Sequence, residues 1–354
     1  MTDPRRTIIW GTGYYGHEGL RCAIEHADIA VVGVHAHASH KVGKDAGLLC
    51  GLDSIGITAT DDIEALLALH ADCLLYYATT GNRDAEAVLD IVPFLEQGTN
   101  VVSIAHYDVQ YPTYGAPAFR DPLLAACERG SSSILLTGTE PGFAFGQHLF
   151  TLLSVAGRVD HVSVVEASNN QQYVGRDSLD MYGFTRPLDF LPSMFTSPVG
   201  ASWHIATVKG IADYLGVRID DVRQRWETAA LDIPFDSAAY GTVAPGTTAG
   251  TRWIVEAMSG GRPFVTYEKI LRLHEDVALD WPTPGMKPRS GNHHIRITGE
   301  PSFENVLQRT GGMSFTSIHP VNAVPFVCDA PIGVVLQQDL PPLRPGNIAA
   351  RGRG

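Results

Sequence analysis

The sequence predicts an α/β protein in which an N-terminal Rossmann domain, a doubly wound parallel sheet, is joined to a second α+β domain. Short apolar runs alternate with helical patterns through the first 145 residues. A glycine-rich turn, GTGYYG, follows the first apolar run directly. The chain of 354 residues is also longer than one hydrophobic core usually serves. We expect the Rossmann domain over 1–145 with a C-terminal return over 315–340, and the second domain over 146–314.

The elements of the first domain follow in order along the chain. The expected strands are RTIIW, IAVVGV, CLLYYA, NVVSIA and SSILLTG. Helical patterns separate them over about Gly16–His26, Asp61–Leu69, Asp84–Gln97 and Pro122–Arg129. Because the strand runs are almost unbroken in apolar character, each strand should be buried on both faces of the sheet.

The second domain is expected to have longer strands in which apolar and polar residues alternate. These are HVSVVEAS, RWIVEAM, PFVTYEKILRL and HHIRIT, with helices near Thr207–Leu215 and Phe303–Gln308. Alternation of this kind leaves an apolar face larger than two helices can cover, which predicts a homodimer. The last apolar stretch, HPVNAVPFVCDAP, has helical spacing and should return to pack on the first domain.

Charge and cysteine content exclude several classes of function. The net charge of -12 argues against a nucleic-acid-binding surface, because phosphate binding needs clustered Lys and Arg. The five cysteines form no CxxC pair, so neither a disulfide framework nor a metal site is expected. No segment resembles a signal peptide or a membrane span, and the sequence reads as a cytoplasmic protein.

The glycine-rich turn predicts a dinucleotide site. Gly11 would allow the tight turn, Gly13 the close approach of a pyrophosphate, and Gly16 the packing of the helix on the strand. Thr12, Tyr14 and Tyr15 complete the loop, whose amide groups at the helix N-terminus favour phosphate. The alternative is a glycine turn that binds nothing.

The end of the second strand favours NADP over NAD. An acidic residue there would accept hydrogen bonds from the adenosine ribose and repel a 2′-phosphate. The stretch GVHAHASHKVGK has no carboxylate and instead offers the donors His35, His37, Ser39, His40 and Lys41. NADP is therefore the preferred cofactor and NAD remains possible; the alternative is a solvated polar loop.

The carboxyl ends of other strands should complete the cofactor site. Ligands of open α/β sheets bind beyond these ends, which indicates Ala78, Thr79 and Thr80 in YATTGN and Ala105 in SIAHYD. Asn322, in the returning segment, is assigned to the same site.

Glu140 follows the apolar run SSILL within TGTEPGF, at another strand end. A carboxylate in this place can hold a cationic amine and exchange a proton with it. Two structural alternatives are a helix cap for the segment starting near Phe143 and a surface pair with an arginine.

Several motifs in a fixed order resemble the native amine dehydrogenases and 2,4-diaminopentanoate dehydrogenase, within the dihydrodipicolinate reductase-like group. They are GTGYYG, HKVGKDAGLLCGL, TGTEPGF, VAPGTTAG and HPVNAVPFVCDAP. The resemblance spans about Thr7 to Val335. It implies a Rossmann domain with a dimerising α+β domain, and NAD(P)H-dependent reduction of a C=N bond made from a carbonyl compound and ammonia.

The resemblance also implies where the catalytic acid should lie. Relatives commonly carry a glutamate in the stretch that matches SIAHYD, where this chain has His106, Tyr107 and Asp108. Glu140 stands where relatives typically have Asn in a GxNPGF-like turn. We therefore predict that Glu140 replaces the missing acid, with the segment His106–Asp108 as the alternative source.

Substrate residues are expected mainly in the second domain. EASNNQQYVGRD supplies Asn169, Asn170, Tyr173 and Arg176 as one wall, and Phe143 is a further candidate; a polar loop or a dimer contact is the alternative for the wall. The segment MYGFTRPLDFLPSMF could close an apolar pocket with Phe184, Phe190 or Phe195, or could be core.

Three functions compete at this level. The first is an amine dehydrogenase that acts on small ketones or aldehydes with ammonia. The second is a reductase of another imine or carbonyl, including a dihydrodipicolinate reductase-like enzyme. For that reaction itself, His293–His294 lacks the expected following motif and reads as an ordinary strand pair. The third is a nucleotide-binding sensor without catalysis.

Overall fold

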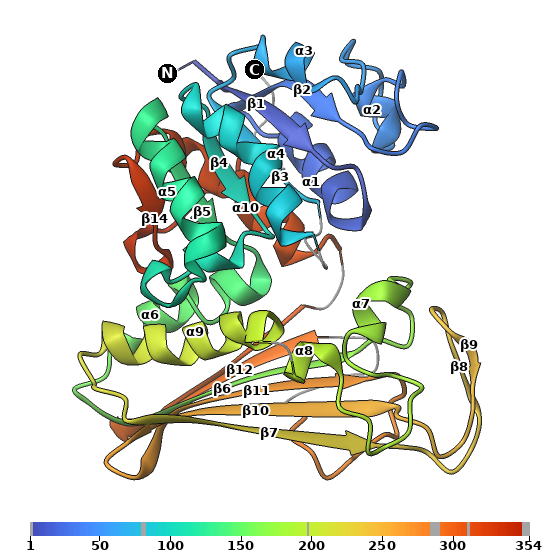
Figure 1. The fold of residues 1–354 in the computed structure, drawn as a ribbon, viewed down its shortest axis with the longest axis vertical. Coiled ribbons are helices and arrows are strands. Elements are labelled where there is room, and N and C mark those ends of the chain that lie inside the picture. The colour runs from blue at the N-terminus through green and yellow to red at the C-terminus, as the bar shows by residue number, and fades with distance from the viewer. Residues whose placement is uncertain (1–2, 79–82, 197, 284–290, 310–311, 349–354) are drawn as a thin grey trace. The chain divides into compact units, whose positions relative to one another are not determined.

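The structure is a computed structural model that describes residues 3–78, 83–196, 198–283, 291–309 and 312–348 (Figure 1). The chain divides into two compact units, the first formed by Met1–Gln147 with Met313–Gly354 and the second by His148–Gly312. Each unit has its own sheet, and the two are described separately.

The described part of the first unit contains a six-stranded sheet in which every pairing is parallel. Its strand order is β14-β5-β4-β3-β1-β2. The bounds are β1 (Arg5–Trp10), β2 (Ile29–His35), β3 (Cys73–Tyr76), β4 (Asn100–Ser103), β5 (Ser133–Leu136) and β14 (Gly333–Val335). Because β1 lies between β2 and β3, the order reverses there, which creates the crevice where such sheets bind ligands.

Helices cover both faces of this sheet, as Figure 1 shows. On one face lie α4 (Asp84–Glu96) and α5 (Pro117–Gly130), whose side chains Ile91, Phe94 and Leu123 form a buried core with Leu74. On the other lie α1 (Tyr14–Ile24) and α10 (Phe315–Cys328), with Leu20 and Val324 buried against Ile9. The Rossmann fold predicted from the apolar runs is confirmed, and the C-terminal return provides both α10 and β14.

Short elements connect the strands at the sheet's edges. Asp45 and Asp62 cap α2 (Ala46–Leu49) and α3 (Ile63–Leu67) by accepting backbone N–H groups with their carboxylates. The turns η1 (Tyr107–Val109), η2 (Pro112–Tyr114) and η3 (Thr139–Phe143) follow β4 and β5, and η4 (Gln337–Asp339) follows β14.

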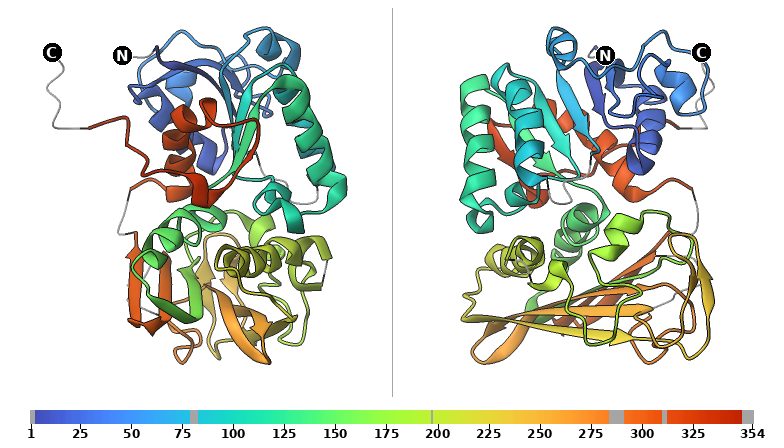
Figure 2. Two further views of the ribbon diagram at one scale, coloured as in Figure 1. Left: turned by 90° about the vertical axis from the view of Figure 1, so that its left-hand side faces the viewer. Right: turned by 45° about the vertical axis from the view of Figure 1, so that its right-hand side comes forward.

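The second unit is built on a mixed sheet of order β13-β12-β6-β11-β10-β7. Its strands are β6 (Arg158–Asn169), β7 (Asp221–Ala229), β10 (Gly250–Ser259), β11 (Arg262–Arg272), β12 (Gly291–Glu300) and β13 (Phe303–Gln308). A hairpin, β8 (Phe235–Ser237) with β9 (Gly241–Val243), and the helices α7 (Arg176–Asp180), α8 (Ser193–Thr196) and α9 (Pro198–Tyr214) complete it, and α6 (Gln147–Leu153) begins at the boundary. Figure 2 shows α9 lying along one face of the sheet.

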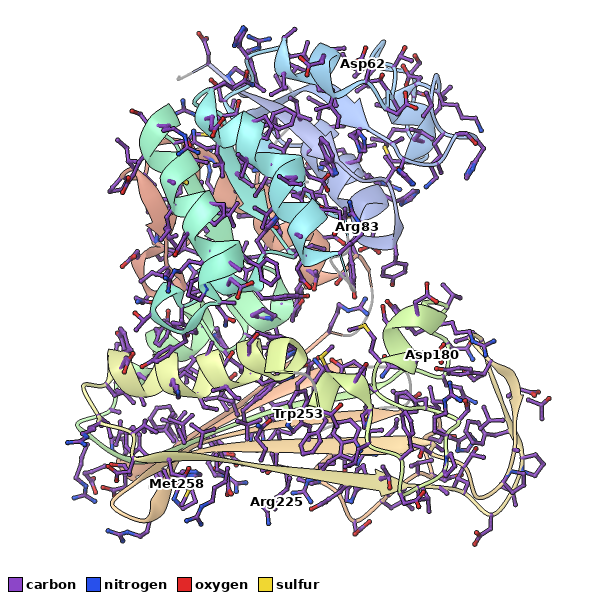
Figure 3. All side chains as sticks on the ribbon, viewed as in Figure 1. Asp62, Arg83, Asp180, Arg225, Trp253 and Met258 are labelled. Atoms are coloured by element: carbon purple, nitrogen blue, oxygen red, sulfur yellow. The ribbon has the colours of Figure 1, made fainter. Side chains whose placement is uncertain are left out.

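Side-chain alternation gives the second sheet two different faces. Trp253 of β10, labelled in Figure 3, lies on the face covered by α9, with its ring centroid 4.0 Å from that of His204. Arg225 of β7 is exposed on the opposite face, where Arg252 bridges Glu227 and Glu268. The α+β character predicted for this unit is confirmed.

One predicted element is wrong. The segment Phe303–Gln308, expected as a helix, is strand β13 and pairs antiparallel with β12. Its apolar residues Phe303, Val306 and Leu307 have the i, i+3, i+4 spacing of a helix, but the free edge of β12 offers unpaired backbone groups that a strand satisfies.

Searching the described ranges for helices that could cross a membrane finds none with the required length and apolar character. All five cysteines have free thiols.

Candidate cofactor and active site

The glycine-rich loop forms the tight turn that its sequence predicts. The backbone of Gly11 has φ +96°, and α1 begins at Tyr14 immediately after Gly13. A Cβ on Gly16 would lie 2.0 Å from the Gly11 carbonyl oxygen, so only glycine allows this packing. A Cβ on Gly13 would meet no atom within 4 Å, which leaves the space over the helix N-terminus open for a phosphate. The loop therefore fits a dinucleotide.

Other loop residues point in different directions. Thr12 is buried, while the Tyr14 side chain is exposed and its ring stands edge-on to that of Tyr15 at 5.1 Å. Ala78 follows β3 at the switch point and lies close to Gly11. A Cβ built on Gly11 would be 3.1 Å from the Ala78 backbone nitrogen. Thr79 and Thr80 lie outside the described residues.

The loop after β2 contains both core and exposed polar groups. The His35 imidazole is buried and stacks on the Trp10 ring, with centroids 3.8 Å apart, and burial lowers its pKa. His37, Ser39 and His40 are exposed. Lys41 Nζ donates to the Thr12 carbonyl at 2.5 Å, which joins this loop to the glycine loop. His35 therefore belongs to the core, whereas His37, Ser39 and His40 lie on the surface of the loop.

Asn322 lies in the middle of α10, half-buried beside the His26 imidazole near the end of α1. It is remote from the N-terminal end of α1, where the glycine loop lies. We therefore leave Asn322 out of the proposed cofactor contacts.

The segment after β4 turns its polar groups into the protein. His106 is buried, with Nε2 donating to the Ala87 carbonyl at 2.8 Å and Nδ1 accepting from the Ser103 hydroxyl at 2.6 Å. Burial lowers its pKa to about 4, so the ring is neutral at pH 7. Tyr107 packs against the core of this face beside buried Ala105, and Asp108 Oδ1 accepts the Ala116 N–H at 2.7 Å. Burial raises the pKa of Asp108.

Glu140 lies in η3, directly after β5, with a half-buried side chain and an extended backbone. The turn is closed by the N–H of Phe143, which donates to the Gly138 carbonyl at 2.9 Å. Gly142 has φ +143°, and a Cβ there would press on Thr137, so the turn depends on glycine. Because β4 and β5 are neighbours, the Glu140 turn and the His106–Asp108 segment leave the same edge of the sheet side by side.

Sequence reasoning missed the side chains that hold this turn. Thr137 Oγ1 lies 2.7 Å from His319 Nδ1, and Thr139 Oγ1 lies 2.8 Å from Thr316 Oγ1, both partners being on α10. The Phe143 ring lies 5.2 Å from the His319 ring. No local signal could have paired these residues, which are far apart in the sequence.

In the second unit, the predicted substrate residues have separate local roles. Asn170 Nδ2 donates to Ser168 Oγ at 2.9 Å, and Asn169 Oδ1 accepts the Gln171 N–H at 3.0 Å. Tyr173 packs with a buried cluster that includes Phe184. Arg176 lies over the Tyr240 ring at 5.1 Å and 3.6 Å from Asp180.

The aromatic residues expected to line a pocket differ in burial. Phe184 is fully buried, Phe190 is 41% exposed, and the Phe195 ring lies edge-on to Trp253 at 5.8 Å. Phe184 therefore belongs to the core, which was the alternative reading for this segment. His293 and His294 both lie within β12, in agreement with an ordinary strand pair.

A buried ion pair on the covered face of the second sheet was also missed. Lys269 Nζ lies 2.6 Å from Glu166 Oε2, which also accepts the Tyr267 hydroxyl at 3.1 Å. The Lys269 ammonium lies 5.1 Å from the Trp203 ring centroid. Lys269 and the charges beside it lower the pKa of Glu166 against the effect of burial. Both residues occupy strand positions that an apolar side chain would normally fill.

Grouping the described His, Cys, Asp and Glu side chains by proximity gives no cluster that could hold a metal ion.

The parallel sheet, its switch point and the glycine loop are those of a dinucleotide-binding protein. Residues 198–349 match the family model described as the 2,4-diaminopentanoate dehydrogenase C-terminal domain. The chain is 31% identical to an amine dehydrogenase of Streptomyces virginiae over 98% of both proteins. It is 25% identical to a 4-hydroxy-tetrahydrodipicolinate reductase of Synechococcus elongatus over 49% of this chain and 61% of that one.

The fold is shared with a solved amine dehydrogenase structure from Mycobacterium smegmatis, with a TM-score of 0.78 and 21% identity over 96% of this chain and 97% of that one. The protein belongs to the amine dehydrogenase and 2,4-diaminopentanoate dehydrogenase family and is an oxidoreductase. Its membership implies a nicotinamide cofactor and an amine or carbonyl substrate.

Proposed function

We propose that this protein is an NADPH-preferring amine dehydrogenase that converts small ketones or aldehydes and ammonia to amines, and runs in reverse as an oxidative deaminase. The observation that carries the proposal is the pair of neighbouring turns after β4 and β5. His106 is enclosed in the core and Asp108 caps a backbone N–H, whereas Glu140 lies in a braced turn at the same edge as the glycine loop.

The cofactor preference rests on the loop after β2. Its described residues from His35 to Lys44 include no carboxylate, so nothing there repels a 2′-phosphate. Ser39, His37 and Lys41 supply donors, and the glycine loop with the α1 N-terminus would hold the pyrophosphate. When bound, NADPH supplies the hydride that reduces the C=N carbon.

Glu140 would act on the protons of the reaction. As ammonia attacks the carbonyl carbon, the carboxylate accepts a proton from the nitrogen and a carbinolamine forms. That proton passes to the alkoxide oxygen, which becomes the hydroxyl of the neutral carbinolamine. A second proton, which Glu140 takes up from solvent, goes to this hydroxyl as the C–O bond breaks and water leaves, and the ionised carboxylate then stabilises the iminium by a charge-assisted hydrogen bond. Hydride addition to the iminium carbon gives a neutral amine, which takes up a proton from solvent, and the resulting ammonium stays paired with Glu140 until release.

The test is a spectrophotometric screen of NADPH oxidation with a panel of ketones and aldehydes, with and without ammonium. We expect oxidation that requires ammonium and is faster with NADPH than with NADH. Oxidation that proceeds without ammonium contradicts amine formation and favours a reductase of another C=N or C=O substrate. Complete absence of turnover, with NADPH still bound, favours the nucleotide-binding sensor.

A further inference from the structure

The turn that carries Glu140 is held by a helix from the other end of the first unit's chain. Thr137 Oγ1 and His319 Nδ1 are 2.7 Å apart although 182 residues separate them in sequence. Thr316 Oγ1 accepts the Thr139 N–H at 3.3 Å and shares a hydrogen bond with the Thr139 hydroxyl at 2.8 Å. We call these four residues the α10 clamp.

The hydrogen-bond partners fix which His319 nitrogen carries the proton. Gln147 Nε2 donates to the Pro341 carbonyl, so its Oε1 faces His319 and accepts from Nε2–H at 3.1 Å. Nδ1 is then the acceptor for the Thr137 hydroxyl. Burial lowers the pKa of His319 to about 4, which keeps the ring neutral and this arrangement intact at neutral pH.

The same helix is tied to the cofactor-binding part of the unit. Glu18 of α1 accepts the Ser314 N–H and the Ser317 hydroxyl, each at 2.8 Å. Tyr77, which follows β3 at the switch point, donates its hydroxyl to the Ser317 carbonyl at 2.7 Å. The first two turns of α10 therefore contact both the glycine-loop helix and the Glu140 turn.

Stability alone does not require polar groups in the clamp. Thr137 is fully buried, and replacing both partners of a buried hydrogen bond by apolar groups of the same shape can leave stability nearly unchanged. What directional hydrogen bonds add is a fixed position for the turn, and a displacement of about 1 Å near a reacting group can cost ~100-fold in rate.

We propose that His319 and Thr137 are positioning residues that hold Glu140 at a fixed place relative to the glycine loop. This rests on the proposed function, in which Glu140 contacts the reacting nitrogen. The clamp acts through the Thr137 side of the imidazole, since Nδ1 faces the turn and Nε2 faces Gln147.

Two His319 variants separate the two sides of the ring. His319→Asn keeps an acceptor at the Nδ1 position for Thr137, and His319→Gln keeps a donor at the Nε2 position for Gln147. We expect His319→Gln and Thr137→Val to lower kcat by about 10- to 100-fold with NADPH affinity unchanged, and His319→Asn to stay close to wild type. Thr99→Val is the matched control, because Thr99 is an equally buried threonine whose hydroxyl bonds Ala71 O at 2.9 Å far from the turn.

Hydrogen exchange of the full-length protein gives a readout independent of activity. The amides of Phe143 and Ala144, bonded to Gly138 and Thr139 at 2.9 Å, should exchange faster in Thr137→Val and His319→Gln but not in His319→Asn or Thr99→Val. Equal behaviour of the two His319 variants in kcat or in exchange overturns the proposal. If the wild-type protein shows no ammonium-dependent turnover, the proposed function fails, and the exchange pattern alone supports or overturns the clamp.

Discussion

Glu140 is the residue on which the proposed chemistry depends, because it is the carboxylate in the turn directly after β5. We expect Glu140→Gln, which keeps the shape and removes the charge, to lower turnover by ~10² or more while NADPH affinity stays nearly intact. Steady-state kinetics with ammonium and a fluorescence titration of NADPH measure the two quantities.

Asp108→Asn is the control for this prediction, since Asp108 caps the Ala116 N–H and should affect stability more than turnover. Loss of activity in Asp108→Asn with Glu140→Gln still active would place the acid after β4. A loss of ~1 kcal/mol of stability in Glu140→Gln with turnover preserved would make it a helix cap.

Lys41 and Ser39 should determine the choice between NADPH and NADH. Each charge-assisted contact with the 2′-phosphate contributes about 1.5 to 3 kcal/mol to binding. Ser39→Ala and Lys41→Ala should therefore weaken the binding of NADPH far more than the binding of NADH. Lys41 also bonds the Thr12 carbonyl in the glycine loop, so the ratio of the two affinities is the informative quantity. An equal loss for both cofactors would limit Lys41 to supporting the loop.

His106 gives the first unit a stability that depends on pH. Burial lowers its pKa from 6.5 to about 4 in the folded protein, so the unfolded chain takes up the proton first as the pH falls. The free energy of unfolding is therefore undiminished by His106 above pH 6.5. It falls by roughly 3 kcal/mol in total as the pH drops from 6.5 towards 4. Urea unfolding at pH 7 and at pH 4.5 measures this difference, and the free energy of unfolding should fall less between the two pH values in His106→Gln than in the wild type. Equal drops would contradict this assignment.

At the scale of elements, the junction of β1 and α1 makes two neighbouring glycines differ in their roles. A Cβ on Gly16 would collide with the Gly11 carbonyl. Gly16→Ala should therefore destabilise the protein by about 1–3 kcal/mol and lower the affinity for both NADPH and NADH. A Cβ on Gly13 meets no protein atom, so Gly13→Ala should keep wild-type stability and lose cofactor affinity alone. Thermal unfolding and NADPH titration of the pair check this, and normal NADPH binding by Gly13→Ala would contradict the pyrophosphate site.

The element that most affects the site comes from the C-terminal part of the first unit's chain. Helix α10 packs on α1 and, through its first two turns, contacts the Glu140 turn. Its apolar spacing is visible in the sequence, but its partners are set by where the sheet places β5 and α1. The position of Glu140 therefore depends on the C-terminal return as much as on its own turn.

At the scale of the whole molecule, we predict a homodimer or higher oligomer that forms through the second unit. One face of its sheet is covered by α9, and the other is a broad surface on which Val306 is 40% exposed and Arg252 bridges Glu227 and Glu268. Light scattering at micromolar concentration should give at least twice the monomer mass of 38.2 kDa. A monomeric mass would contradict the prediction.

The sequence by itself determined the fold class, the glycine loop and the family, because these depend on local patterns: apolar runs, the spacing of glycines and the order of short motifs. It predicted a helix over Phe303–Gln308, which is a strand. The apolar residues of this segment allow either element, and only the pairing with strand β12 decides between them. It proposed His106, His35 and Asn322 for the site by their position in the chain; only the structure shows that His106 and His35 are buried and that Asn322 lies in the middle of α10. Only the tertiary structure brings together Thr137 and His319 of the α10 clamp, because a hydrogen bond between residues 182 apart leaves no local pattern in the chain.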